Sequence, residues 1–340
     1  MGITLRKVAE RAGVSVKTVS RIVNDDPLVR SETRAAVQLI LREMNYVPDE
    51  AARLMRGGPS IIIGLMTDVV ATTPYSGDIV RGVQARLKAD GKTLLIANTE
   101  GDPQLEQEYW RMFRAHKVAG AIYATMFHRA LDAGRPDFNH AIVLVNCFSS
   151  QGARPCVLPD DEGGGYTQAA HLLRLGHRRI GVISLSPIII ANNLRAAGMR
   201  RAFAQAGVTF DALLETPGFS GPLDNETLIA FDVAVTMLSV RSRPTAIICG
   251  NDKVALQVFA AAAHCGLSVP GDISVMGFDD MAVIAETLRP GLTTVGLPYF
   301  EMGKLAAAMI DEAAEKGENW APRALVPCPL VERGSCRPLV

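Results

Sequence analysis

Cysteine pairs and long apolar runs are the features that this 340-residue sequence lacks most clearly. Its six cysteines are scattered, with no Cys-x-x-Cys pair and no His/Cys cluster at the spacing of metal ligands. Scattered cysteines are typical of reduced thiols in a cytosolic protein. No apolar run approaches the roughly 20 residues of a membrane span, and the N-terminal MGITLRKVAE lacks the apolar core of a signal peptide. We therefore expect a cytoplasmic protein without a membrane partner or a metal site.

The motifs of common enzymes are also missing. No Gly-x-Gly-x-x-Gly follows the first expected strand, and neither a phosphate-binding Gly-x-x-x-x-Gly-Lys-Ser/Thr nor a Gly-x-Ser-x-Gly occurs. The acidic pairs Asp160-Asp161 and Asp279-Asp280 are adjacent in sequence, so neither pair indicates the facing carboxylates of a glycosidase. The sequence therefore predicts no catalytic residues, no enzyme activity and no cofactor.

The charge is balanced overall but unevenly divided. The net charge is zero, yet residues 1–58 hold ten Lys and Arg against seven Asp and Glu, a local charge of +3, and the remainder carries −3. A modestly basic head on a modestly acidic body fits a separate module that binds a polyanion. The length also predicts two or three folded units rather than one.

Two short amphipathic helices joined by a glycine turn are predicted over residues 4–23. Leu5 and Val8 share one helical face, and Gly13 supplies the positive φ that a tight turn needs. Ser15 can cap the second helix. The outward side of that helix carries polar donors that can reach phosphates and base edges, namely Lys17, Thr18, Ser20 and Arg21. The pattern favours a DNA-binding helix-turn-helix over an ordinary helical corner.

After residue 23 the predicted secondary structure is first helical and then alternates between strands and helices. A third helix near 31–44 closes the small head, and residues 48–56 form a helical segment too short to be stable alone in water. From residue 60, strands rich in Ile, Val and Leu alternate with helices, which is typical of parallel sheets covered on both faces. Two doubly wound lobes are therefore expected, with ligand-binding residues just after the strands.

These residues resemble the lactose-repressor (LacI/GalR) family of bacterial transcription regulators. Residues 3–23, followed by NYVPDEAARLMR at 45–56, are similar to its head. DDEGGGYTQAAHLLRLGHRRIGVIS at 160–184 is similar to its body, with Asp161 in place of the usual asparagine. Further similar segments, in the family's order, are RAAGMRRAFAQAG (195–207), PTAIICGND (244–252), VPGDISVMGFDD (269–280) and LTTV (292–295).

The resemblance implies an all-α helix-turn-helix head plus an α/β body of two doubly wound lobes of periplasmic-binding-protein type. The expected boundaries are a DNA-binding head at 1–47, a hinge helix or linker at 48–58, and an effector-binding and dimerisation domain at 59–340. The two lobes of that domain are expected at 59–160 plus 297–322, and at 161–296 plus 323–340.

In the resembled family the hinge segment folds on the operator and pushes an apolar side chain into the minor groove. Met55 stands at that position here, with Leu54 as the alternative. The full set of expected DNA-binding residues is Thr4, Ser15, Val16, Lys17, Thr18, Ser20, Arg21, Asn24, Tyr46, Ala52, Arg53 and Met55.

Strand-end side chains are expected to bind a small effector, since carboxylates accept hydroxyl protons and a guanidinium donates to neighbouring oxygens. The alternatives are an interdomain Arg195–Asp279 ion pair and, for the aromatic residues, simple core packing. Asn146 stands where the resembled family often has an acidic residue. The expected effector-binding residues are Tyr75, Ser76, Asn146, Arg195, Phe219, Asn251, Asp279 and Tyr299.

The resulting interpretation is a transcriptional repressor whose affinity for a near-palindromic operator is controlled by a small molecule. A sugar or sugar derivative is the commonest effector in the resembled family. Some members of the resembled family form tetramers through an added C-terminal leucine repeat. No leucine heptads follow the last strand here, so a homodimer is expected. The alternative is a sugar-binding transport protein without a transcriptional role, which predicts a signal peptide and no basic head.

Overall fold

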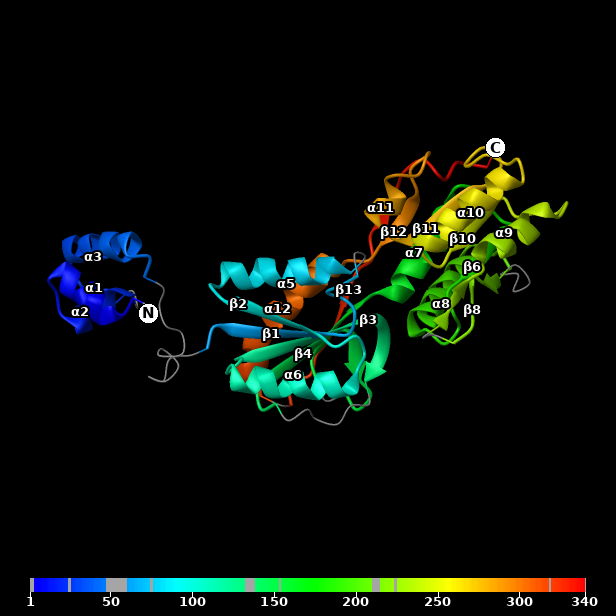
Figure 1. Cartoon of the computed structure of the whole chain (residues 1–340). Coiled ribbons are helices and arrows are strands. Elements are labelled where there is room, and N and C mark those ends of the chain that lie inside the picture. The colour runs from blue at the N-terminus through cyan, green and yellow to red at the C-terminus, as the bar shows by residue number, and fades with distance from the viewer. Residues whose placement is uncertain are drawn as a thin grey trace. The chain divides into compact units, whose positions relative to one another are not determined.

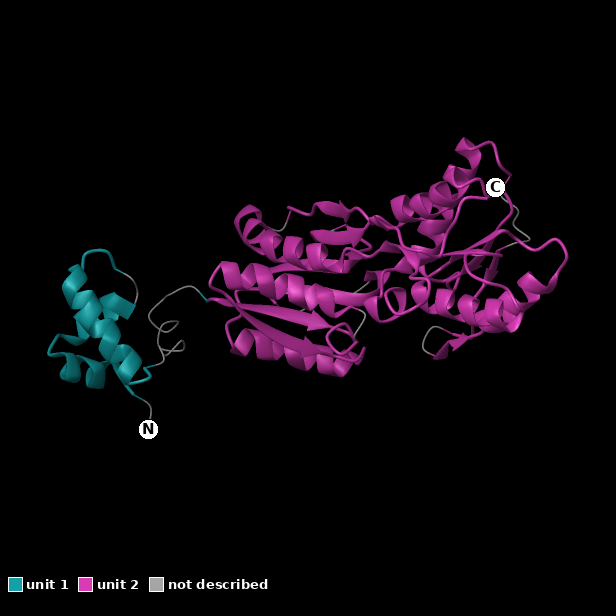
Figure 2. Ribbon diagram, turned by 90° about the horizontal axis from the view of Figure 1, so that it is seen from above, with its two compact units in different colours: residues 1–60 teal, residues 61–340 magenta. Residues whose placement is uncertain are grey.

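The structure, a computed structural model, forms two compact units, residues 1–60 and 61–340 (Figure 2). The predicted hinge segment at 48–58 lies outside the described residues, as do Asn24 and Tyr75. The residues that the structure describes are 3–23, 26–46, 60–73, 76–131, 138–152, 154–209, 215–222, 225–317 and 319–339.

Unit 1 is a small three-helix domain that confirms the predicted helix-turn-helix. Its helices are α1 (Leu5–Ala12), α2 (Val16–Val23) and α3 (Ser31–Glu43). Gly13 ends α1 in the left-handed region at φ 63°, where a side chain would be strained. The Ser15 hydroxyl accepts a hydrogen bond from the Thr18 N–H at 3.0 Å and so caps α2. The buried core of the unit consists of Val8, Ala9, Val19, Ile22 and Val37.

The first lobe of unit 2 is a six-stranded parallel sheet with helices on both faces (Figure 1). Its strands are β1 (Ile62–Thr67), β2 (Thr93–Asn98), β3 (Gly120–Leu131), β4 (Ala141–Ser149), β5 (Cys156–Pro159) and β13 (Arg323–Val326), in the order β13-β5-β4-β3-β1-β2. α5 (Gly77–Ala89) and α12 (Tyr299–Lys316) share one apolar core with the sheet. α6 (Pro103–Ala115) packs Trp110 and Phe113 into a second core.

The second lobe repeats this arrangement. Its strands are β6 (Ile180–Ser184), β7 (Glu215–Pro217), β10 (Ala246–Cys249), β11 (Ser274–Asp279), β12 (Thr293–Gly296) and β14 (Leu330–Val331), in the order β14-β12-β11-β10-β6-β7. Only β14, of these strands, pairs antiparallel. The helices are α7 (Asp161–Arg174), α8 (Ile190–Gln205), α9 (Ala230–Ser239), α10 (Asp252–His264) and the short α11 (Ala282–Ala285). β8 (Phe219–Ser220) and β9 (Thr227–Leu228) form a separate two-stranded antiparallel sheet. Residues of α7 and α8 contribute to one core and residues of α9 and α10 to another.

Two element boundaries differ from the sequence prediction. β13 pairs in parallel with β5, so residues 323–326 belong to the first lobe and not, as predicted, to the second. The chain therefore passes between the lobes after β5, after β12 and after β13. The apolar segment AGAIYA at 119–124 predicts a strand that ends at 124. β3 instead continues to Leu131, past a bulge between Ala124 and Arg129.

Glycines bring α7 and α8 into direct backbone contact. A Cβ at Gly198 would lie 1.9 Å from the Glu162 carbonyl oxygen, and one at Gly165 would lie 2.1 Å from the Arg195 carbonyl oxygen. No larger residue fits at either position without separating the helices. This crossing holds Arg195 of α8 beside the first turn of α7.

Candidate functional site

A cavity lies between the two lobes of unit 2, at the carboxyl ends of the strands. Its empty volume is about 790 Å³, including solvent at its mouth. Its lining residues are Met126, Phe127, His128, Asn146, Pro159, Asp161, Leu185, Ile189, Ala191, Arg195, Phe219, Glu226, Asn251, Lys253, Asp279, Met281, Leu297 and Tyr299.

The cavity brings together most of the residues predicted to bind the effector. Those that line it are Asn146, Arg195, Phe219, Asn251, Asp279 and Tyr299. Tyr75 lies outside the described residues. The predicted aromatic residues have two roles, since Tyr299 also packs against the core of the first lobe and Phe219 against that of the second.

Ser76 does not line the cavity, which corrects its prediction as a ligand contact. Its side chain is fully buried, and its hydroxyl lies 3.3 Å from both the Val70 carbonyl oxygen and the Met126 sulfur. The residue lies between β1 and α5, at the N-cap of that helix, where its side chain is buried and does not line the cavity. Ser76 therefore supports Met126 rather than the effector.

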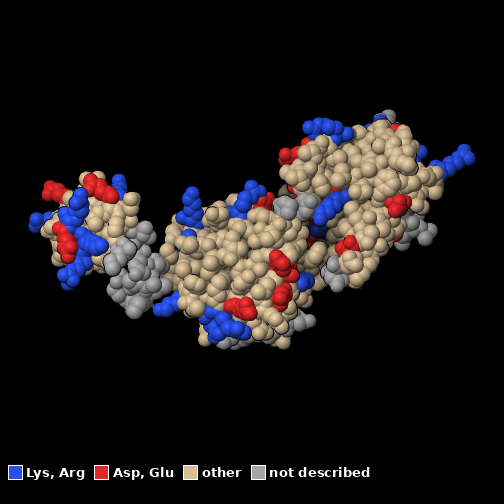
Figure 3. All heavy atoms as spheres, viewed as in Figure 1, with Lys and Arg blue, Asp and Glu red and all other residues tan. Residues whose placement is uncertain are grey.

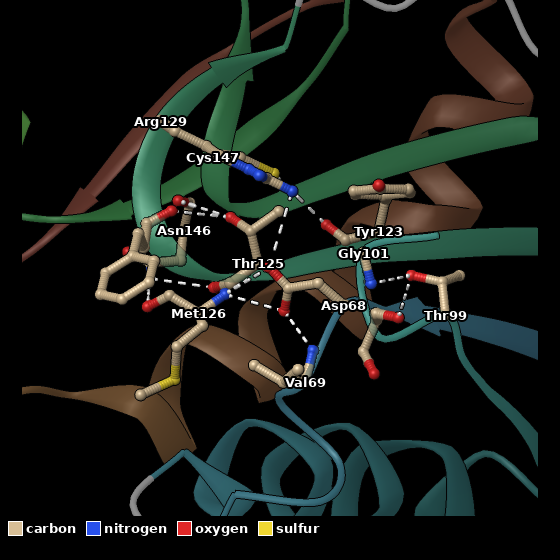
Figure 4. Close-up of polar contacts among 12 residues, drawn as sticks. Asp68, Val69, Thr99, Gly101, Tyr123, Thr125, Met126, Arg129, Asn146 and Cys147 are labelled. Carbon is tan, nitrogen blue, oxygen red and sulfur yellow. Dashed lines mark hydrogen bonds and ion pairs between the residues drawn. The ribbon is translucent and has the colours of Figure 1, made fainter. Parts of the chain in front are cut away.

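Asn146 uses its amide group to hold the bulge of β3 (Figure 4). Its Nδ2 donates to the carbonyl oxygens of Thr125 and Met126, both at 3.0 Å. The Asp68 carboxylate accepts from the Met126 N–H at 3.1 Å and from the Val69 N–H at 2.6 Å. Together these bonds fix the segment that presents Met126, Phe127 and His128 to the cavity.

Replacing Asn146 by aspartate is expected to destabilise unit 2 by about 1–3 kcal/mol. The carboxylate would face two carbonyl oxygens that now accept hydrogen bonds. Urea unfolding of the full chain measures the change. The exposed Asn193→Asp is the matched control, since it loses a single surface contact to the Pro187 carbonyl oxygen. Equal unfolding free energies for the two variants would contradict this role of Asn146.

A chain of charged groups runs along the floor of the cavity. The Asp161 carboxylate accepts from Arg195 Nε at 2.9 Å through Oδ1 and lies 2.9 Å from His128 Nδ1 through Oδ2. Arg195 also donates from Nη1 to the Gly250 carbonyl oxygen at 2.7 Å and lies 3.8 Å from Asp279. Its guanidinium stacks on the Phe278 ring, 3.5 Å from the centroid. The Arg195–Asp279 ion pair of the alternative prediction is therefore present, but it joins two residues of the second lobe and is not interdomain.

The pKa values of the buried carboxyls reflect their different partners. Burial acts to raise the pKa of Asp161, but Arg195 and the His128 hydrogen bond outweigh it, so that pKa lies below its usual value. Burial raises the pKa of Asp279 to about 7, against the opposing effect of Arg195. Burial, with the nearby Asp279, raises the pKa of Asp252 to about 8.

Stability should therefore fall as pH rises towards 8, because folded Asp252 holds a proton that the unfolded carboxyl loses near its ordinary pKa of 3.8. The slope is at most about 1.4 kcal/mol per pH unit for one group. Between pH 6.5 and 8, Asp252→Asn should flatten the decline, whereas the exposed Asp232→Asn should leave it unchanged. Urea unfolding at several pH values measures this, and identical pH profiles for the wild type and Asp252→Asn would contradict it.

Two cavity residues have strained backbones. Asn146 has φ 57° and Asp279 has φ 105°, both outside the region that non-glycine residues prefer. Such strain persists only where surrounding contacts determine the conformation, and it is common at binding sites. Each residue lies in the carboxyl-terminal half of its strand, β4 or β11, where the strain turns its side chain to the cavity.

Two residues of this site lie outside the sequence prediction. His128 carries no sequence signal, because it is a lone histidine without partners at metal spacing. Asp161 is distinguished in the sequence only by its departure from the usual asparagine. That substitution was the available signal, since an extra buried carboxylate must find cationic or hydrogen-bonding partners, and here these are Arg195 and His128.

On unit 1, α2 presents an exposed polar surface. Ser15, Val16, Lys17 and Arg21 are exposed, while Thr18 and Ser20 are partly buried. Arg21 pairs with Asp26 at 3.3 Å. Thr4 is exposed at the start of α1, and Tyr46 packs against the core of the unit. Figure 3 shows Lys and Arg side chains interspersed with Asp and Glu on the visible face of this unit.

Within the described ranges, no group of three or more His, Cys, Asp or Glu residues could hold a metal ion. No helix in the same ranges is sufficiently long and apolar to cross a bilayer.

Comparison with known proteins gives matches to both units. Residues 4–49 match the bacterial regulatory proteins of the lacI family, and residues 169–336 match a periplasmic binding protein-like domain. The chain is 32% identical to the sucrose operon repressor of Escherichia coli over 335 residues, which cover 98% of this chain and 99% of that protein.

Two solved structures are similar to this chain over nearly its whole length. The chain resembles the lac repressor dimer bound to operator and the anti-inducer ONPF with a TM-score of 0.79 and 24% identity, over 99% of this chain and 100% of that one. It resembles the regulator CelR in complex with cellobiose with a TM-score of 0.63 and 26% identity, over 98% and 99%. The likeness to the lac repressor structure is one of fold alone.

Proposed function

The chain belongs to the LacI family of bacterial regulatory proteins, and we propose that it is a transcriptional repressor whose operator affinity is set by a sugar-like effector. The observation that carries this proposal is the presence, in one chain, of a helix-turn-helix unit and a cavity lined by polar strand-end residues. Two of the relatives support a sugar, since one is the sucrose operon repressor and the other, CelR, was solved with cellobiose.

We assign operator reading to α2 and the segments beside it. Exposed donors such as Lys17 and Arg21 suit base edges and phosphates in a major groove. The proposed DNA-contacting residues are those of the sequence prediction, with Met55 of the hinge as the minor-groove wedge.

The proposed working form is a homodimer in the cytoplasm. A single three-helix head buries little surface on DNA, whereas two heads on a twofold axis combine through their effective concentration. This geometry requires a near-palindromic operator with half-sites about one helical turn apart or a multiple of it. The lac repressor structure of similar fold is a dimer bound to operator.

The cavity is proposed to bind rather than to catalyse. Both oxygens of Asp161 are engaged by Arg195 and His128, and the Asp279 carboxyl lies 3.8 Å from Arg195. Closure of the lobes around a sugar would change how the paired hinge segments meet. Such coupling is typically worth about 1–3 kcal/mol. The alternative, a solute-binding transport protein, does not account for the match of residues 4–49 to a DNA-binding family.

The test selects duplexes from a random library with the full chain at moderate salt, and screens sucrose, cellobiose, ribose, sugar acids, polyols and purines by thermal shift. A twofold-symmetric consensus is expected, together with a stabilising sugar, which at 100 times its Kd adds about 2.7 kcal/mol. Recovery of no enriched duplex would overturn the repressor function. Stabilisation by a purine alone would overturn the sugar assignment.

A further inference from the structure

His128 is a cavity residue with one ring nitrogen engaged and the other unsatisfied. It lies at the bulge of β3, is 4% exposed, and packs edge-on against Phe148 with ring centroids 5.8 Å apart. Nδ1 is 2.9 Å from Asp161, whereas Nε2 is buried without a hydrogen-bond partner among the described residues. A buried polar atom without a partner is costly, and in a binding cavity a ligand group can satisfy it.

Asp161 decides which nitrogen carries the proton. An ionised carboxylate only accepts hydrogen bonds, and Asp161 is kept ionised by Arg195, which donates to its other oxygen at 2.9 Å. The proton of a neutral His128 therefore sits on Nδ1. Nε2 is left with a lone pair and can only accept.

Asn146, on the same wall, is restricted in the same way. Both amide protons of its Nδ2 go to backbone carbonyl oxygens of the β3 bulge, so Oδ1 is the atom left for a ligand. In Asn251, across the cavity, the atom left for a ligand is a donor. Its Oδ1 accepts from the Val254 N–H at 3.0 Å, so Nδ2 remains to donate. His128 and Asn146 of the first lobe thus present acceptors, while Asn251 of the second lobe presents a donor.

We propose that His128 is a specificity-determining residue of the effector site, which together with Asn146 selects an uncharged effector that donates hydroxyl hydrogens to the first lobe. This inference rests on the proposed function and narrows the effector class. Arg195 is already committed to Asp161 and lies near Asp279. The cavity cations of the second lobe are Arg195 and Lys253, and Asp279 is an electrostatic partner of both. A carboxylate or phosphate on the effector would therefore meet acceptors on the first lobe and cations already balanced by carboxylates on the second.

The tautomer is tested without any ligand. In ¹⁵N NMR of the full chain labelled on histidine, the His128 resonances, identified by their loss in His128→Asn, should report a proton on Nδ1. In Asp161→Asn, the new amide can accept from Arg195 through Oδ1 and donate to Nδ1 through Nδ2. The proton should then move to Nε2. A wild-type ring protonated on Nε2 would overturn the proposal.

Ligand selectivity is tested by calorimetry with sucrose, cellobiose, ribose, glucose, glucuronate, ribose 5-phosphate and glucose 6-phosphate. The variant His128→Asn keeps a donor near Asp161 but removes the acceptor Nε2. Neutral sugars that bind the wild type should bind it about three- to tenfold more weakly. A deoxy analogue that lacks the contacting hydroxyl should bind both proteins equally. The exposed His140→Asn is the matched control.

The outcomes separate the two claims. Tighter binding of the acids or phosphate esters than of the neutral sugars, or unchanged affinity in His128→Asn, would overturn the role of His128. Binding of no sugar in the panel by a chain that still binds its operator would also overturn it, while the repressor function stands. Sugar binding with the predicted His128 dependence but without operator binding would overturn the repressor function and support this inference.

Discussion

Replacing Lys17 and Arg21 together by alanine is expected to weaken operator binding by at least roughly 30-fold, since specific base contacts are worth about 1–3 kcal/mol each. Both side chains are exposed on α2, and in a homodimer each change removes two contacts. The unfolding free energy of unit 1 should hardly change. The Arg21–Asp26 pair is on the surface, where ion pairs contribute little.

Fluorescence anisotropy with the selected duplex measures the loss, and salt dependence shows how many phosphate contacts disappear. The double substitution Arg11→Ala, Arg42→Ala is the matched control, because it also removes two exposed positive charges, from α1 and α3 of the same unit. If this control weakened binding as much as the substitutions in α2, the effect would be one of net charge and α2 would not be the reading helix.

Arg195→Ala is expected to abolish the response to sugar and to destabilise unit 2 by about 3–5 kcal/mol, the usual cost of breaking a buried ion pair. The substitution leaves the Asp161 carboxylate buried without its cation and removes the guanidinium from the Phe278 ring. Urea unfolding gives the stability change, and operator titration with and without sugar gives the response.

A second variant separates binding from folding. Arg195→Met combined with Asp161→Asn leaves no buried charge from this pair and keeps an apolar side chain over Phe278. It should recover most of the lost stability and retain operator binding, yet remain unresponsive to sugar. Normal regulation by sugar in this folded variant would show that Arg195 is not part of the effector site.

Much of the fold could be predicted from local patterns in the sequence. The Gly13 turn, the Ser15 cap and the apolar faces of α1 and α2 are encoded within a few residues, and the structure has each of them. Alternation of apolar strands with helices similarly predicted two doubly wound lobes. Asn251 and Asp279 were expected just after strands and Arg195 was expected in the effector site, and all three line one cavity.

The remaining features depend on contacts between distant segments. The β3 bulge is fixed by Asp68 and Asn146, 58 and 20 residues away from Met126, and no local pattern signals it. His128 is brought to Asp161 only because that bulge turns it into the cavity. The residues of the short β13 do not indicate which of the two sheets the strand joins. It was predicted in the second lobe, but it pairs with β5 of the first lobe.

The central claim is that the cavity and the operator-reading helices are coupled, and operator titration of the full chain with and without a saturating sugar from the panel tests it most directly. The account predicts preference for a twofold-symmetric duplex over random DNA, and a change of about 5- to 150-fold in operator affinity with sugar. The doubly substituted Arg195→Met, Asp161→Asn protein should show the preference without the change. Equal affinity for symmetric and random duplexes at moderate salt, with and without sugar, would contradict the account.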